Sequence, residues 1–97
     1  MCGIIGYVGK KEANDILING LEKLEYRGYD SAGICTINNN SLNTNKKLGR
    51  VEILKGEEKL LGKIGIGHTR WATTGVPSDE NSHPFTDQKN EFSLVHN

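Results

Sequence analysis

A cysteine directly behind the initiator methionine is the first feature of this chain that could do chemistry. The sequence opens MCGIIGYVG, and removal of Met1 would leave Cys2 with a thiol and an α-amino group on one residue. An α-amine titrates at about pH 8 and a thiol at about pH 8.5, so each can assist the other near neutral pH. The amine would then be a built-in general base, as in N-terminal nucleophiles, and Gly3 has no side chain to block a substrate. The alternative is a small buried hydrophobic residue at the start of a strand.

A second group of reactive side chains stands in GHTRWATTG, residues 67–75. Arg70 offers a planar fork that matches a carboxylate through two hydrogen bonds, which favours an anchoring role. Trp71 and Thr73 follow it at the point where a strand should give way to a loop. The alternative is a surface arginine stacked on Trp71 by a cation–π contact.

Two further clusters are compatible with either chemistry or structure. In EYRGYDSAG, residues 25–33, Asp30 and Ser31 fit a turn in which side chains satisfy backbone groups. A Ser–His–Asp hydrolase using Ser31 is formally available, but the sequence around it lacks the nucleophile-elbow pattern. In the final LVHN, the amide of Asn97 could donate to a developing oxyanion.

The elements that must position these residues alternate irregularly between strands and helices. Apolar, glycine-rich and β-branched stretches predict strands, and a 3.6-residue apolar period predicts helices. Strands come in clusters, which indicates an α+β fold and argues against a Rossmann-type alternation. The expected order is a strand over 2–9, a helix over 10–28, a strand over 31–38, a polar turn or hairpin tip over 38–46, a weak helix over 49–62, a strand over 63–71, a polar loop over 72–90 and a last strand over 91–97.

Composition excludes several classes of function. Twelve basic and twelve acidic side chains cancel, which argues against nucleic acid or an anionic membrane as a partner. No apolar run approaches the roughly 18 to 20 residues of a membrane-spanning helix, and there is no secretory signal, so we expect a cytoplasmic location. Two cysteines make no disulfide framework. The three histidines are scattered and lack the spacing of a zinc site, so we expect no metal and no cofactor.

Taken together, the motifs identify a resemblance to a known family. The stretches MCGIIGYVG, LEYRGYDSAG, GHTRWATTG, HPF and LVHN resemble the class II glutamine amidotransferases in order and approximate spacing over essentially the whole chain. The wording of EYRGYDSAG and HTRWATTG favours the branch that acts on fructose 6-phosphate. The resemblance implies an N-terminal-nucleophile hydrolase fold, with two antiparallel sheets between helical layers. It implies hydrolysis of L-glutamine to glutamate and ammonia, with a separate sugar-isomerase domain using the ammonia to make glucosamine 6-phosphate from fructose 6-phosphate.

The resemblance also assigns roles to residues. Cys2 matches the nucleophile, and Arg27 matches an arginine beside the catalytic terminus. Arg70 matches the arginine that holds the α-carboxylate of glutamine. Trp71 and Thr73 match residues of the loop that closes over the substrate. Asn97 matches the side-chain half of the oxyanion hole.

Some family features are missing, and they set the alternatives. The glycine that supplies the second oxyanion donor, an aspartate that receives the substrate ammonium and the sugar-isomerase half would all follow Asn97. Thr74 stands where some members have histidine. We therefore expect residues 1–97 to be a truncated N-terminal glutaminase domain, inactive alone, from an enzyme that is a homo-oligomer at full length. The alternatives are another class II enzyme, such as phosphoribosylpyrophosphate amidotransferase, and an inactive remnant or interaction fragment.

Overall fold

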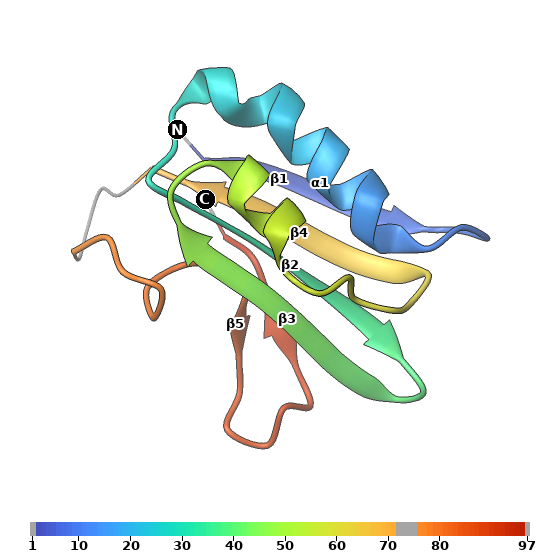
Figure 1. The fold of residues 1–97 in the computed structure, drawn as a ribbon. Coiled ribbons are helices and arrows are strands. Elements are labelled where there is room, and N and C mark those ends of the chain that lie inside the picture. The colour runs from blue at the N-terminus through green and yellow to red at the C-terminus, as the bar shows by residue number, and fades with distance from the viewer. Residues whose placement is uncertain (1, 72–75, 97) are drawn as a thin grey trace.

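A computed structural model describes residues 2–71 and 76–96 of the chain. Its elements follow the order expected for an α+β protein (Figure 1). They are strand β1 (Gly3–Val8), helix α1 (Ala13–Leu24), 3₁₀ helix η1 (Glu25–Arg27), strands β2 (Ser31–Asn38) and β3 (Ser41–Leu48), 3₁₀ helix η2 (Val51–Gly56), and strands β4 (Ile64–Arg70), β5 (Phe85–Thr86) and β6 (Ser93–Leu94).

The main sheet is antiparallel and has the strand order β1-β4-β2-β3. Strand β4 comes late in the sequence but lies between β1 and β2. The register pairs Gly3 of β1 with Thr69 of β4, and Ser31 of β2 with Arg70. The start of β1, the start of β2 and the end of β4 therefore meet at one corner of the sheet. Strands β5 and β6 form a separate antiparallel pair.

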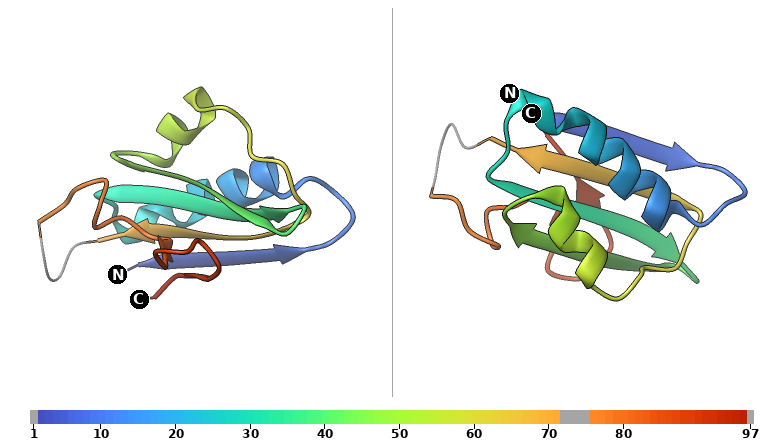
Figure 2. Two further views of the ribbon diagram at one scale, coloured as in Figure 1. Left: turned by 90° about the horizontal axis from the view of Figure 1, so that it is seen from below. Right: turned by 45° about the horizontal axis from the view of Figure 1, so that its top comes forward.

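Helix α1 and η2 cover one face of this sheet and enclose the core (Figure 2). A Cβ atom added to Gly67 of β4 would lie 2.9 Å from Cγ2 of Ile5 and 3.1 Å from Cδ1 of Leu21, so the helix packs directly onto the strand backbone. This close approach excludes water from the apolar layer, which stabilises the sheet. The buried apolar side chains are Ala13, Leu17, Ile18, Leu21, Ala32, Ile34, Val51 and Leu54.

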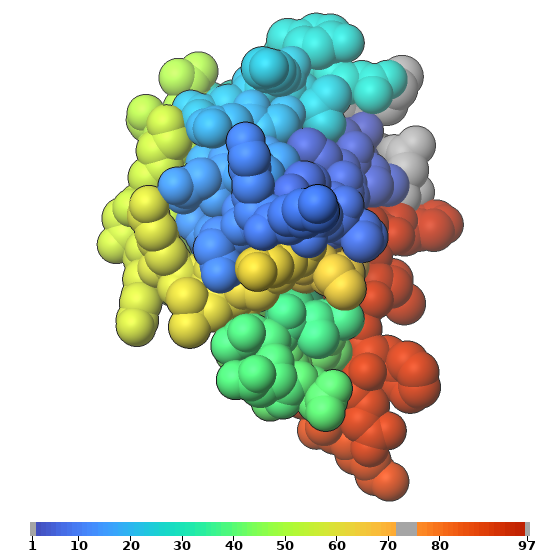
Figure 3. Space-filling view, turned by 90° about the vertical axis from the view of Figure 1, so that its right-hand side faces the viewer, coloured from blue at the N-terminus to red at the C-terminus, as the bar shows by residue number. Residues whose placement is uncertain are grey.

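The segment 76–96 lies on the opposite face, as Figure 3 shows in orange and red. A Cβ atom on Gly33 of β2 would collide with the carbonyl oxygen of His83, so the missing side chain is what lets this segment reach the sheet. Lys46 of β3 holds it there through a hydrogen bond of 3.1 Å from Nζ to the carbonyl oxygen of Ser82. The sheet therefore has a different layer on each side.

Three sequence expectations need correction. The polar stretch 38–46 is mostly strand β3, and the turn is confined to Asn39 and Asn40, whose φ angles of 50° and 62° suit a tight two-residue hairpin. Polar side chains are tolerated there because β3 is an edge strand. The expected helix over 49–62 shrinks to the six residues of η2, and the last strand shrinks to the two residues of β6.

The helices in the described part of the chain are all too short or too polar to cross a membrane. The cytoplasmic location stays a prediction.

Candidate active site

The β1–β4 corner positions Cys2. The backbone N–H of Gly3 donates to Oγ1 of Thr69 at 3.2 Å, and Sγ of Cys2 lies 4.0 Å from the carbonyl oxygen of Trp71. A Cβ atom on Gly3 would lie 2.7 Å from Oγ1 of Thr69 and 2.8 Å from Cβ of Leu24. Glycine is therefore required next to Cys2 because strand and helix pack tightly there, whereas the sequence suggested that it clears a path for substrate. The thiol is half-buried at the end of a rigid strand.

Arg70 lies at the same corner but inside the protein. It is 8% exposed, so the alternative of a surface arginine is wrong. Its Nη1 lies 4.0 Å from Oδ1 of Asp30, and the backbone N–H of Asp30 donates to the Arg70 carbonyl oxygen at 2.6 Å. A guanidinium has five N–H donors in a fixed fork, so one carboxylate partner orients it without using its whole capacity. Asp30 thus fixes the position of Arg70 through backbone and side chain together.

Trp71 follows at the surface and is 50% exposed. Its ring packs against Gly28, where a Cβ atom would lie 2.9 Å from Cε3 of the indole. Gly28 also has a φ angle of 103°, which side chains of L-residues rarely adopt. The glycine of EYRG is therefore needed both for the turn and for the indole.

Arg27 ends η1 directly before Gly28 and is exposed. Because Leu24 packs on Gly3 and Gly28 packs on Trp71, the short helix η1 belongs to the same corner. The structure thus brings together Cys2, Arg27, Arg70 and Trp71, as the resemblance led us to expect. Thr73, Thr74 and Asn97 lie outside the described residues.

The alternative nucleophile Ser31 has no hydrolase geometry. Its side chain is fully buried in β2, and its Oγ makes no hydrogen bond to any residue within 2–71 and 76–96. A serine nucleophile needs a base within hydrogen-bonding reach. Ser31 is therefore a structural residue, as its position opposite Arg70 in the sheet suggests.

The histidines are not scattered, contrary to expectation. His68 of β4 is fully buried, and its ring stacks on that of His83 with centroids 4.1 Å apart. Its Nε2 lies 2.7 Å from the carbonyl oxygen of His96. Burial lowers the pKa of His68, although the hydrogen bond to His96 opposes that effect. Burial, aided by the nearby positive charges of His68 and Arg70, lowers the pKa of His83 to about 4. Both rings are thus neutral at pH 7.

This arrangement predicts acid sensitivity. The unfolded chain binds a proton on His83 at about pH 6.5, whereas the folded chain binds it only near pH 4. The free energy of unfolding should therefore fall as the pH drops from about 6.5 to about 4. His83→Phe keeps a ring on His68 but removes the titration, so its urea midpoint, followed by circular dichroism, should fall less between pH 7 and pH 5. His96→Gln, at an exposed position, is the control that should keep most of the wild-type dependence.

Comparison with known proteins agrees with this geometry. No protein-family model matches the chain. The glutamine–fructose-6-phosphate aminotransferase (isomerizing) of Clostridium tetani is 58% identical over the whole chain, and that of Clostridium acetobutylicum is 56% identical. Among solved structures, the glutamine phosphoribosylpyrophosphate amidotransferase of B. subtilis superposes with a TM-score of 0.74 at 34% identity over 93% of the chain. The chain has the sequence and the fold of a class II glutamine amidotransferase domain.

The match covers only part of each relative. The chain spans 16% of the length of the two clostridial enzymes and 20% of the solved structure. For this amidotransferase domain the α+β, N-terminal-nucleophile fold class is confirmed. Sequence reasoning missed the pairing of Asp30 with Arg70 and the bond from Gly3 to Thr69, because both depend on strand register. The only available signal was that the motifs EYRGYDSAG and GHTRW carry more polar residues than strand ends need.

Proposed function

We propose that the protein hydrolyses the side-chain amide of L-glutamine with Cys2 as nucleophile, and that the full-length enzyme uses the ammonia to convert fructose 6-phosphate to glucosamine 6-phosphate. The printed names of the relatives, glutamine–fructose-6-phosphate aminotransferases at 56–58% identity, support this substrate pair. The structural likeness to phosphoribosylpyrophosphate amidotransferase is weaker in sequence, at 34%, so it favours the shared glutamine chemistry and not that second substrate.

The chemistry assigns one task to each residue of the corner. After loss of Met1, the α-amine of Cys2 takes the thiol proton while Sγ attacks the amide carbon of glutamine. The tetrahedral intermediate places its negative charge on the oxygen, where the amide of Asn97 donates a hydrogen bond. The same proton passes to the leaving nitrogen, ammonia departs, and water then hydrolyses the thioester to glutamate. Arg70 holds the α-carboxylate, Trp71 and Thr73 close over the substrate, and Arg27 lies beside the nucleophile.

One observation carries the proposal: the thiol of Cys2 and the guanidinium of Arg70 belong to the meeting ends of neighbouring strands. The N–H···Oγ1 bond of Gly3 to Thr69 and the 4.0 Å contact of Cys2 with Trp71 hold the nucleophile beside a buried, carboxylate-oriented arginine. Glutamine needs both groups a few ångströms apart, one at each end of the amino acid. The test of the proposal is glutamate release from glutamine by the full-length protein, with intact mass to establish that Met1 is removed.

Arg70→Lys should separate glutamine binding from the later chemistry. Lysine keeps the charge but loses the fork that matches a carboxylate, so binding should weaken by about 1.5–3 kcal/mol, or roughly 10- to 150-fold in the glutamine KM. Use of added ammonia, which bypasses this site, should be unchanged. If both activities fall equally, Arg70 supports the fold through Asp30 and does not bind substrate. Arg50→Lys, at a fully exposed position, is the control that should change neither activity.

We further propose that residues 1–97 are the front part of the glutaminase domain of a cytoplasmic homo-oligomer, and that they have little activity as a separate polypeptide. Three observations support this: the 16% share of the relatives' length, the few residues of β6, and the apolar side chains on the sheet face opposite α1. An inactive remnant differs from this proposal by lacking activity at full length as well.

A further inference from the structure

Three histidines far apart in the sequence meet beneath β4, and the chemistry proposed above does not use them. His68 is fully buried, with its ring plane 19° from that of His83. Its Nε2 lies 2.7 Å from the carbonyl oxygen of His96, at the end of the segment that follows β6. The chain therefore places a buried polar side chain from the central sheet against the backbone just before Asn97.

The direction of this hydrogen bond follows from its partners. A carbonyl oxygen only accepts, so Nε2 of His68 carries the hydrogen and donates. Within residues 2–71 and 76–96, Nδ1 of His68 has no hydrogen-bond partner. The low pKa of the buried ring agrees with a neutral Nε2–H tautomer. The single polar contact of this side chain in the described structure is therefore the one to His96.

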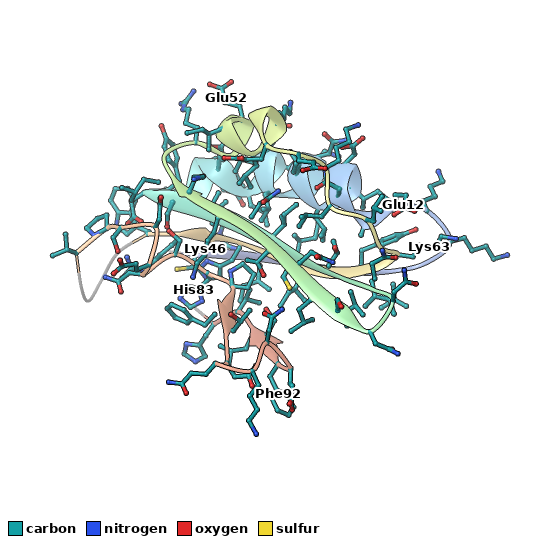
Figure 4. The ribbon with its side chains drawn as sticks, turned by 60° about the horizontal axis from the view of Figure 1, so that its bottom comes forward. Glu12, Lys46, Glu52, Lys63, His83 and Phe92 are labelled. Atoms are coloured by element: carbon teal, nitrogen blue, oxygen red, sulfur yellow. The ribbon has the colours of Figure 1, made fainter. Side chains whose placement is uncertain are left out.

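The His68 ring is itself held in place from the far side. His83 stacks on it and is supported in turn by Phe85, whose ring centroid lies 4.3 Å away. Lys46 ties the same turn to β3 through the Ser82 carbonyl oxygen (Figure 4). An imidazole fixed by packing on both sides is a rigid donor, which is what a positioning group requires.

The segment held by His68 carries a proposed catalytic group. It is anchored at one end by the pairing of β6 with β5, where Leu94 lies opposite Phe85, and at the other by the hydrogen bond of His96 to His68. His68 is also two residues before Arg70 on β4, so one strand connects the carboxylate-binding arginine to the main chain before Asn97. A misplacement of about 1 Å in an active-site group can cost about 10²-fold in rate.

We propose that His68 is a positioning residue for the oxyanion-stabilising amide of Asn97, acting through the backbone carbonyl of His96. This inference rests on the proposed glutaminase function. It predicts an effect on the transition state and little effect on glutamine binding, because the oxyanion exists only after attack by Cys2.

A matched pair of variants tests it in the full-length protein. His68→Gln places an amide N–H at about the position of Nε2, whereas His68→Asn is shorter and carries its N–H nearer the backbone. His68→Asn should lower kcat for glutamate release by about 10-fold or more, with glutamine KM within about threefold. His68→Gln should recover most of that loss.

Alkylation of Cys2 by iodoacetamide supplies a readout that a purely structural role would change. Sulfur displaces iodide from a saturated carbon and no oxyanion forms, so His68→Asn should react at the wild-type rate. Parallel loss of alkylation and kcat would show that His68 only maintains the fold, and an unchanged kcat in His68→Asn, or equal damage in His68→Gln, would also overturn the proposal. If the wild type and Cys2→Ala release glutamate equally, the proposed function itself fails, and this inference with it.

Discussion

Cys2→Ala should lower kcat for glutamate release from glutamine at least about 10⁴-fold in the full-length protein, while glutamine still binds. The thiol is the atom that forms the covalent intermediate, and removal of such a nucleophile typically costs several orders of magnitude because no neighbouring group replaces it. In the described structure Ser31 makes no hydrogen bond to a base, so it does not substitute. Arg70 and its pairing with Asp30 are untouched by the change, so calorimetric titration should still detect glutamine.

The second cysteine gives a matched control. Cys35 is 2% exposed within β2, and its Sγ contacts the backbone of its neighbour Thr36 at 3.9 Å. Cys35→Ala should therefore keep glutaminase activity, with a modest loss of stability from the vacated space. Intact-mass analysis of the active protein should show that Met1 is absent. Activity that survives Cys2→Ala, or an active protein that retains Met1, would refute Cys2 as the N-terminal nucleophile.

Local sequence determines the inner strands well and the edge poorly. The glycine-rich, β-branched composition of β1, β2 and β4 predicts strands, and these form where expected. Strand β3 escapes such reasoning because most of its residues are polar, and its existence depends on pairing with β2 instead of on burial. A short-range pattern contains no information on such a partner, which is why the turn at Asn39–Asn40 appeared too long.

The same limit applies to the site. The residue types at Cys2, Arg70 and Trp71 point to nucleophile, carboxylate binder and substrate cover before any coordinates are known. Their mutual placement depends on β4 lying between β1 and β2, which the order of elements along the chain does not reveal. Residues that act through others, such as Asp30 behind Arg70 and His68 behind His96, carry no motif of their own. They become visible only through contacts across the sheet.

Glycine at the corner has a specific physical role that a motif alone does not explain. Gly3 lies where Thr69 and Leu24 would contact a side chain, and Gly28 lies where the indole of Trp71 would contact one. Removing both side chains brings β1, the end of α1 and the start of the substrate loop within van der Waals contact. The thiol is thus fixed to the sheet by its neighbours, which is the pre-organisation that attack on an amide requires.

Residues 1–97 expressed as a separate polypeptide should release glutamate at least about 100-fold more slowly than the full-length protein. The resemblance places a second oxyanion donor and an ammonium-binding aspartate after Asn97, and loss of one oxyanion donor alone costs about 10²–10³ in rate. In the separate polypeptide, Asn97 also carries the terminal carboxylate, whose negative charge opposes a developing oxyanion.

The sheet adds a second reason for low activity. On the face opposite α1, Ile4, Ile37 and Ile64 are 47%, 43% and 45% exposed, so this apolar layer is only partly covered and the isolated domain should be marginally stable. The measurement is glutamate release by the Met-free polypeptide, beside its own Cys2→Ala variant as background and the full-length protein as reference, with circular dichroism to report folding. A folded polypeptide within about tenfold of the full-length rate, less than the loss of one oxyanion donor predicts, would mean that Cys2, Arg70 and Asn97 already complete the site. A folded polypeptide with the expected loss would place the missing contribution in the catalytic groups beyond Asn97, since stability would then be accounted for.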